Sequence, residues 1–465
     1  MTDRRTFRWA TTGARVLSGT LVAAAFVVAV VTAVALPWPT LAREPVQVTA
    51  TPAPEASVLT CAGSLLALGR DAAAADAVTA AAPQVLTAGV REGSPPPSES
   101  TLTSDVADSV ASVFVAEPQG RTRTDVAASG SVTIADEDLS GFAASACRPP
   151  LMESWLVGGS TSTGSSGIVV IGNPGVVAAT VELTVYGTNG PVVPPGGQLV
   201  VAAGAQRVVT LAGLALGEDS PVIRVSATGA PVTASLQASI TRTLVPGGVD
   251  QIGAIQAPEP HLYIPGVSVV DTGGGGADAS TALRLLSPSS DTTATVTVTP
   301  TGQPDPGQPL SVTLAAGKPL DLDLGGLTPR EYTVRVDAAA PVLGAVWQTT
   351  GFDEGADFAW YTPAPGITVP SLFATPAGPS PAVTVVNPTD KDVSVAVDAV
   401  DGSSSTTVTI PAERSARFSL RSRTVYALEA DGAVRAGVSL TGVGALAGYP
   451  VWSADTAAEP IVVYP

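Results

Sequence analysis

The feature that most constrains the fold is an internal repeat that begins near residue 150. Four segments carry a proline, a short apolar strand pattern and a further proline or glycine: residues 150–158, 260–265, 365–370 and 460–465. Their leading prolines are 110, 105 and 95 residues apart. Because the same order of patterns follows within each interval, the sequence predicts three copies of one structural unit.

Alternating side chains within each copy predict half-buried β-strands. In the third copy, for example, Val393, Val395 and Val397 alternate with Ser394, Ala396 and Asp398. Period-two alternation of β-branched residues is typical of such strands, and Asn-Pro, Gly and Ser turns separate them.

The pattern predicts a mainly β chain of tandem immunoglobulin-like sandwiches, with about seven strands in each hundred residues. The alternative is a β-propeller-like ring built from three two-blade repeats. The final strand, at 460–465, is expected to complete the third unit or to pair back and close a ring.

The N-terminal segment predicts a membrane-spanning helix. Four arginines precede an uncharged run at residues 16–36, and a helix of 21 residues rises about 31 Å. By the positive-inside rule, residues 1–15 form a cytoplasmic basic tail, and the bulk of the chain is extracellular and single-pass anchored. Small residues before Ala42 support the alternative, a cleaved signal peptide and a secreted protein.

The two cysteines, Cys61 and Cys147, predict a disulfide outside the cytoplasm. They bracket a predicted N-terminal domain at 55–150, which follows a Pro- and Ala-rich stalk at 37–54. On the chain-entropy model, this bond stabilises the fold by about 4–5 kcal/mol. Alanine-rich sequence predicts a helix around residues 70–82. The three β-repeats are expected at 151–258, 259–363 and 364–465.

Composition argues against several function classes. The formal charge of −17, from 23 basic and 40 acidic residues, argues against binding nucleic acid. The one histidine, His261, lies in a predicted edge strand and is expected to face solvent. The glycine run at 273–276 lacks the following helix that a phosphate-binding loop needs. With no recognised nucleophile motif in the sequence, we predict a protein that is not an enzyme.

One segment, residues 352–361, combines carboxylates with aromatic rings. Its candidate binding residues are Asp353, Glu354, Asp357, Trp360 and Tyr361. Oxygen ligands suit Ca²⁺, and carboxylates beside aromatic planes suit glycans. The simpler interpretation is a domain-junction loop whose aromatic residues fill the gap between units. The Ser-, Thr- and Gly-rich loop at 158–167 is a second place where binding residues are expected.

The sequence resembles a known family at three points: Cys147-Arg-Pro-Pro, Glu153-Ser-Trp155 and Ile171-Gly-Asn173-Pro174. That family comprises actinobacterial secreted or membrane-anchored proteins that share a domain of unknown function. The resemblance implies one N-terminal span, a cysteine pair and β-rich repeats. It implies no catalytic residue.

We therefore expect a non-enzymatic cell-envelope protein, anchored through residues 16–36, whose β-domains act as a scaffold or binding module. The expected partners are the membrane and a cell-wall polymer or envelope protein. One alternative is an envelope glycan hydrolase that uses carboxylates such as Asp353, Glu354 or Asp357. Another is an accessory subunit of an envelope-polymer assembly complex.

Overall fold

The computed structural model describes residues 4–35, 48–50, 54–70, 73–74, 76–272, 280–303, 307–454 and 461–463. The chain divides into two units, Met1–Pro52 with Glu459–Pro465 and Ala53–Ala458. Most of the predicted stalk, the residues around Ala42 and the glycine run at 273–276 lie outside the described residues.

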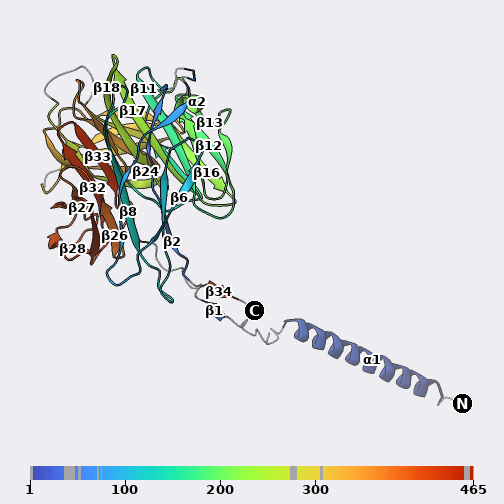
Figure 1. Cartoon of the computed structure of the whole chain (residues 1–465). Helices are drawn as coiled ribbons and strands as arrows, with labels where there is room; N and C mark the ends of the chain where they lie inside the picture. Colours follow the sequence, from blue (N-terminus) through green and yellow to red (C-terminus); the bar gives the residue numbers. More distant parts are fainter. Residues whose placement is uncertain are drawn as a thin grey trace. The chain divides into compact units, whose positions relative to one another are not determined.

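The first unit contains one long apolar helix, α1 (Arg4–Ala35), drawn as a continuous ribbon in Figure 1. Its segment Thr12–Ala35 has a mean hydropathy of 2.3, and it is the one helix of the described chain long and apolar enough to cross a membrane. A signal sequence near the N-terminus can meet the same criteria of length and hydropathy.

The same unit holds a short antiparallel ribbon of β1 (Val48–Ala50) and β34 (Ile461–Val463). The expectation that the last strand completes the third repeat or closes a ring is therefore wrong. The last strand pairs instead with residues 48–50, within the first unit.

Residues 53–458 form a mainly β unit (Figure 1), and from residue 153 onward the predicted repeat is visible in the strand order. The first repeat contains β10 (Glu153–Val157), β11 (Ser165–Asn173), β12 (Ala179–Gly187), β13 (Gly190–Val192), β14 (Gln198–Val201), β15 (Ala205–Thr210), α2 (Leu211–Ala215), β16 (Val222–Thr228), β17 (Thr233–Arg242) and β18 (Val245–Gly253). The second contains β19 (Glu259–Val269), β20 (Thr281–Leu286), β21 (Thr292–Pro300), β22 (Leu310–Leu314), β23 (Leu320–Asp323), β24 (Arg330–Thr349) and β25 (Phe358–Tyr361). The third contains β26 (Ser371–Thr375), β27 (Ala382–Val386), β28 (Val393–Ala399), β29 (Ser405–Ile410), β30 (Ser415–Ser419), β31 (Thr424–Ala430), β32 (Arg435–Gly442) and β33 (Ala445–Pro450).

Each repeat arranges its strands in the same two antiparallel sets. In the third repeat the orders are β26-β31-β28-β29 and β30-β27-β32-β33. The first repeat has the matching orders β10-β16-β12-β13 and β15-β11-β17-β18. In the second repeat the long strand β24 replaces two strands: its first half pairs with β19 and β21, and its second half with β20 and β25.

Side-chain alternation positions these strands as predicted. In β28, residues Val393, Val395, Val397 and Ala399 are buried and the intervening residues are half-buried. The third copy differs in one respect, because residues 365–370 form no strand and Ile367 makes only an isolated bridge to Val434. The opening strand there is β26, a few residues later.

The Asn-Pro turns have a specific structural role. Asn173 and Asn387, both fully buried, donate from Nδ2 to the carbonyl oxygen four residues ahead, at 2.8 and 2.6 Å. Each also donates to a carbonyl oxygen at the end of a neighbouring strand, Val201 or Ile410. A buried amide can satisfy these turn carbonyls where water cannot reach.

Residues 54–150 form eight further strands. They are β2 (Ser57–Thr60), β3 (Leu65–Leu68), β4 (Val78–Ala82), β5 (Val85–Val90), β6 (Ser98–Ser104), β7 (Ala111–Ala116), β8 (Val126–Ala135) and β9 (Ser140–Ala146). The helix predicted around 70–82 is wrong: residues 78–82 are strand β4, paired with β3. Pairing with a neighbouring strand overrides the helix propensity of alanine.

The predicted disulfide joins Cys61 and Cys147, with 4.0 Å between their Cα atoms. The segment it closes also joins the first repeat, because β6 pairs in parallel with β15.

Candidate functional site

The predicted acidic and aromatic segment does not form one surface site. Asp353 and Glu354 are exposed, whereas Asp357, Trp360 and Tyr361 are only 0, 7 and 2% exposed. Among the described residues, no group of three or more His, Cys, Asp or Glu side chains could hold a metal ion.

Asp357 instead joins four parts of the second unit. Its Oδ2 accepts hydrogen bonds from the backbone N–H groups of Phe142 in β9 (3.0 Å) and Leu446 in β33 (3.1 Å). Its Oδ1 accepts one from Val249 in β18 (3.2 Å). Burial raises the pKa of this carboxyl well above its usual value, against the effect of these hydrogen bonds. We call this arrangement the Asp357 junction.

Two glycines give the carboxylate room at the Asp357 junction. Gly141 and Gly248 have φ values of +148° and +117°, and a Cβ on either would lie 2.7 Å from Asp357 Oδ1. Side chains at these positions would therefore displace the carboxylate. Asp357 therefore serves as a buried acceptor for backbone N–H groups of three other strands.

A second buried carboxylate, Asp250, links β18 to β25. Asp250 Oδ2 accepts the backbone N–H of Trp360 at 2.7 Å, and its Oδ1 accepts that of Gln251. Burial raises the pKa of Asp250 to about 7, although these two hydrogen bonds act in the opposite direction.

A concavity lined by aromatic and polar side chains lies between the first and second repeats, and we call it the seam pocket. Its volume is about 180 Å³. Its walls include the aromatic residues Trp347, Phe358 and Trp360, the charged residues Arg284 and Asp321, and the serines Ser160, Ser165, Ser166 and Ser239.

Arg284 organises the seam pocket. It is 3% exposed, and its guanidinium lies over the ring of Trp360 at 4.9 Å. The same group binds Asp321 through two hydrogen bonds of 2.9 and 3.0 Å, and donates to the carbonyl of Gly159 at 2.7 Å. One side chain of the second repeat thereby fixes the loop at 158–167 of the first.

The charge of Asp321 is stabilised at this site. Burial acts to raise the pKa of Asp321, but the hydrogen bonds and charge of Arg284 together with the hydroxyl of Ser220 hold it below its usual value. The pocket thus presents an ionised carboxylate beside indole rings and hydroxyl groups. The indole rings can stack on the ring of a ligand. The carboxylate and the serine hydroxyl groups can exchange hydrogen bonds with the hydroxyl groups of that ligand.

The seam pocket suits a small ligand or one ring of a longer one. Its volume is below the roughly 300–1,000 Å³ of sites for drug-sized ligands. Asp321 is the one acidic residue among the described residues that line it. Most glycosidases use two facing carboxyl groups, and the described residues that line this pocket do not include such a pair.

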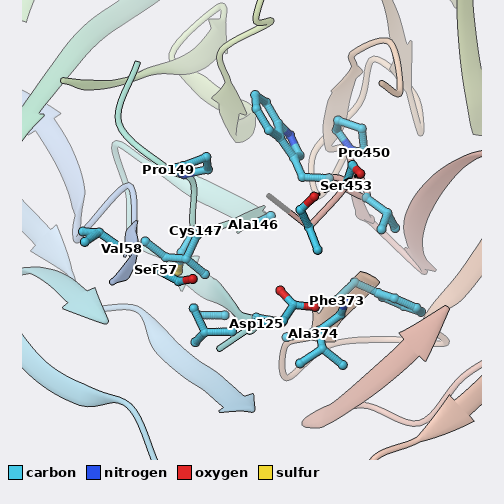
Figure 2. Close-up of a pocket in the computed structure, with 18 of the residues that line it drawn as sticks. Ser57, Val58, Asp125, Ala146, Cys147, Pro149, Phe373, Ala374, Pro450 and Ser453 are labelled. Atoms are coloured by element: carbon cyan, nitrogen blue, oxygen red, sulfur yellow. Dashed lines mark hydrogen bonds between the residues drawn. The ribbon is translucent and has the colours of Figure 1, made fainter. Parts of the chain in front are cut away.

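A smaller pocket, of about 70 Å³, lies between the disulfide segment and the third repeat. Figure 2 shows Ser57, Val58, Cys147 and Pro149 on one side of it and Phe373, Ala374, Pro450 and Ser453 on the other. Asp125 ties the two sides together, because its Oδ2 accepts the backbone N–H of Leu372 at 2.9 Å. The pocket is largely apolar and its polar groups serve the fold.

His261 is exposed, as expected from the sequence. Its side chain is 60% exposed, and Nδ1 lies 2.8 Å from Asp337 Oδ1. It lines none of the pockets described above.

Comparison with known proteins identifies a family for this chain. The model of the family of unknown function DUF5719 matches residues 102–421, more than half of the chain. The chain belongs to this family. No curated protein matches the chain. The matched range contains the first two repeats whole and the third repeat up to residue 421, so it includes Arg284 and the segment at 352–361.

Sequence patterns identified only part of the seam pocket. Trp360 and the loop at 158–167 were both singled out as candidates, and the structure brings them to the same pocket. Arg284, Asp321 and Trp347 were not. Arg284 lies in an otherwise uncharged strand, Thr281–Leu286. A single charged residue among apolar ones was the sequence feature that could have indicated a buried functional group.

Proposed function

We propose that this DUF5719 protein is a non-enzymatic cell-envelope protein, anchored by one helix, whose extracytoplasmic β-repeats bind a wall glycan at the seam pocket. The observation that carries this proposal is the arrangement of Trp347 and Trp360 around the Arg284–Asp321 pair, next to a serine-rich loop. This combination suits a neutral, hydroxyl-rich ring.

Two features support an extracytoplasmic position. The apolar helix α1 is long enough to act as an anchor, and the Cys61–Cys147 disulfide is the kind of bond that persists in oxidising compartments. If α1 is retained, the four arginines in its N-terminal half, ahead of the uncharged run at 16–36, favour a cytoplasmic N-terminus and extracytoplasmic repeats.

We further propose that each repeat is an immunoglobulin-like sandwich rather than a pair of propeller blades. In the third repeat, two four-stranded antiparallel sheets contribute to one apolar core around Val383, Val395 and Leu428, which supports this proposal. Blades of a propeller would instead pack in succession around a channel.

The alternative of a glycan hydrolase has weaker support. Asp357, one of its candidate acids, is fully buried and bonded to three backbone N–H groups. Asp353 and Glu354 remain available on the surface. The binding experiment described in the next paragraph also tests this alternative if the reaction products are measured.

The test is a fluorescence titration of the purified full-length protein in detergent with soluble fragments of the host's wall polysaccharide. We expect saturable binding that Trp347→Ala weakens about tenfold or more, because a ring-stacking contact is lost. Trp452→Ala is the matched control, since Trp452 lines the other pocket. Equal affinity of the parent and Trp347→Ala would refute this site, and new reducing ends in the mixture would favour the hydrolase.

A further inference from the structure

A small cavity beside the disulfide contains polar groups that the rest of the fold does not explain. We call it the Arg148 cavity. Its volume is about 20 Å³, and its lining residues include Thr60, Ser145, Arg148, Gln206 and Gly253. About 10–15 Å³ is enough for one particle the size of a water molecule.

Arg148 is the central group of this cavity. Its side chain is 7% exposed, and Nε, Nη1 and Nη2 are all buried without a hydrogen-bond partner. One face of the guanidinium is covered by the ring of Trp452 at 4.5 Å. The group also lies against Gly253, where a Cβ would be 2.7 Å from Nη2 and 2.9 Å from Nε. Because Gly253 lines the cavity, the guanidinium lies at its wall.

Three further side-chain atoms at this cavity have no partner. They are Thr60 Oγ1, Ser145 Oγ and Gln206 Oε1, all buried. Both hydroxyl groups can donate, and rotation of the Gln206 amide exchanges its oxygen for an N–H donor. Around a cavity for one particle, the chain thus offers a cation and three potential donors.

The charge of Arg148 has no counter-charge at the cavity. None of the described residues that line it is Asp or Glu. Burial lowers the pKa of Arg148 to about 9, so the guanidinium remains charged at neutral pH. A buried charge that is neither paired nor hydrogen-bonded is very costly, so a native fold is expected to compensate it.

We propose that the Arg148 cavity binds one small monovalent anion, of which chloride is the simplest member, through the Arg148 guanidinium and the hydroxyl groups of Thr60 and Ser145. A water molecule would satisfy some of these hydrogen bonds but would leave the charge uncompensated. Larger oxyanions exceed the volume.

An anion in this cavity contacts residues of both the disulfide segment and the first repeat. Thr60 and Arg148 exchange backbone hydrogen bonds of 2.8 and 2.9 Å, directly beside Cys61 and Cys147. Two other lining residues, Gln206 and Gly253, belong to the first repeat. Binding at this place therefore stabilises the folded state rather than serving exchange with solvent.

The first experiment measures the unfolding temperature of the full-length protein in detergent, with chloride replaced by gluconate at constant ionic strength. Gluconate is too large for the cavity. We expect chloride to raise the unfolding temperature of the parent in a saturable manner. Arg148→Met is expected to show no chloride dependence and to unfold at a higher temperature than the parent in gluconate, because the uncompensated charge is gone.

A second variant keeps the proposal testable if Arg148→Met does not fold. Thr60→Val removes one hydroxyl and is expected to raise the half-saturating chloride concentration about tenfold, because a hydrogen bond to a charged group is lost. Thr87→Val is the matched control, since Thr87 Oγ1 is also buried and unpartnered but does not line the cavity.

Crystals soaked in bromide give an independent measurement, because bromide scatters anomalously. An anomalous peak beside Arg148 that is absent in Arg148→Met would support the proposal. Equal unfolding temperatures of the parent in chloride and gluconate, or an equal response to chloride in the parent and Thr60→Val, would overturn it and leave water as the occupant.

Discussion

Removal of the carboxylate at the Asp357 junction tests how the second unit is held together. Asp357→Ala leaves the backbone N–H groups of Phe142, Val249 and Leu446 without an acceptor, in a place where the replaced side chain is 0% exposed. An unsatisfied buried N–H costs about 1–3 kcal/mol, so three cost about 3–9 kcal/mol. That range overlaps the whole stability of a typical domain, about 5–15 kcal/mol.

A graded pair of variants separates lost hydrogen bonds from lost volume. Asp357→Asn keeps one oxygen, which can still accept from Phe142 and Leu446, and it leaves only the Val249 N–H unsatisfied. We expect a cost of about 1–3 kcal/mol for this variant. Asp353→Asn, an exposed acid in the same segment, is the control and is expected to change stability by less than about 0.5 kcal/mol.

The assay is denaturant unfolding of the solubilised full-length protein, followed by tryptophan fluorescence and by far-UV circular dichroism. The expected order of destabilisation is Asp357→Ala, then Asp357→Asn, then Asp353→Asn. If Asp357→Ala unfolds within about 1 kcal/mol of the parent, the carboxylate does not join these strands energetically and the reasoning fails.

Three other measurements follow from the structure. Because burial raises the pKa of Asp250 to about 7 from 3.8, its stabilising contribution is fully present below pH 4 and is lost as pH rises through 7. In the parent, this group should change the free energy of unfolding by about 4 kcal/mol between pH 4 and 8, and Asp250→Asn should remove that change. The same dependence of the unfolding free energy on pH in the parent and in Asp250→Asn would contradict the prediction. Reduction of the Cys61–Cys147 bond, which closes a loop with a sequence separation of 86, should cost about 4–5 kcal/mol and slow the protein on a non-reducing gel relative to the oxidised form. Gly248→Ala should destabilise far more than Gly204→Ala, since both have positive φ but only Gly248 adjoins Asp357; equal unfolding temperatures would argue against steric crowding there.

Local patterns were sufficient to predict a mainly β chain with one N-terminal apolar helix. Alternation in β28 and the Asn-Pro turns at 173 and 387 depend on neighbouring residues, and the structure places these residues as the patterns indicate. The error at residues 70–82 has the opposite cause. Alanine carries little information about burial, so the pairing of β3 with β4, a tertiary effect, decides the structure there.

The sites were less predictable because their parts are distant in sequence. The partners of Asp357 are backbone N–H groups 215, 108 and 89 residues away, and a backbone group has no sequence signature. Arg148 likewise looks like an ordinary residue beside a cysteine. Only the lack of a hydrogen-bond partner for its buried guanidinium nitrogens distinguishes it.

The Asp357 junction also constrains the order of folding. During synthesis from the N-terminus, β9 exists long before Asp357, and Leu446 follows Asp357 by a further 89 residues. Contacts between such distant segments form slowly, because the entropy of closing the intervening loops must be lost first. Phe142 and Ala144 of β9, which pack in the core of the third repeat, therefore stay uncovered until nearly the whole chain has been made. Exposed apolar side chains make an incompletely folded chain prone to aggregation, so we expect chaperones to bind this chain until its last repeat has been synthesised.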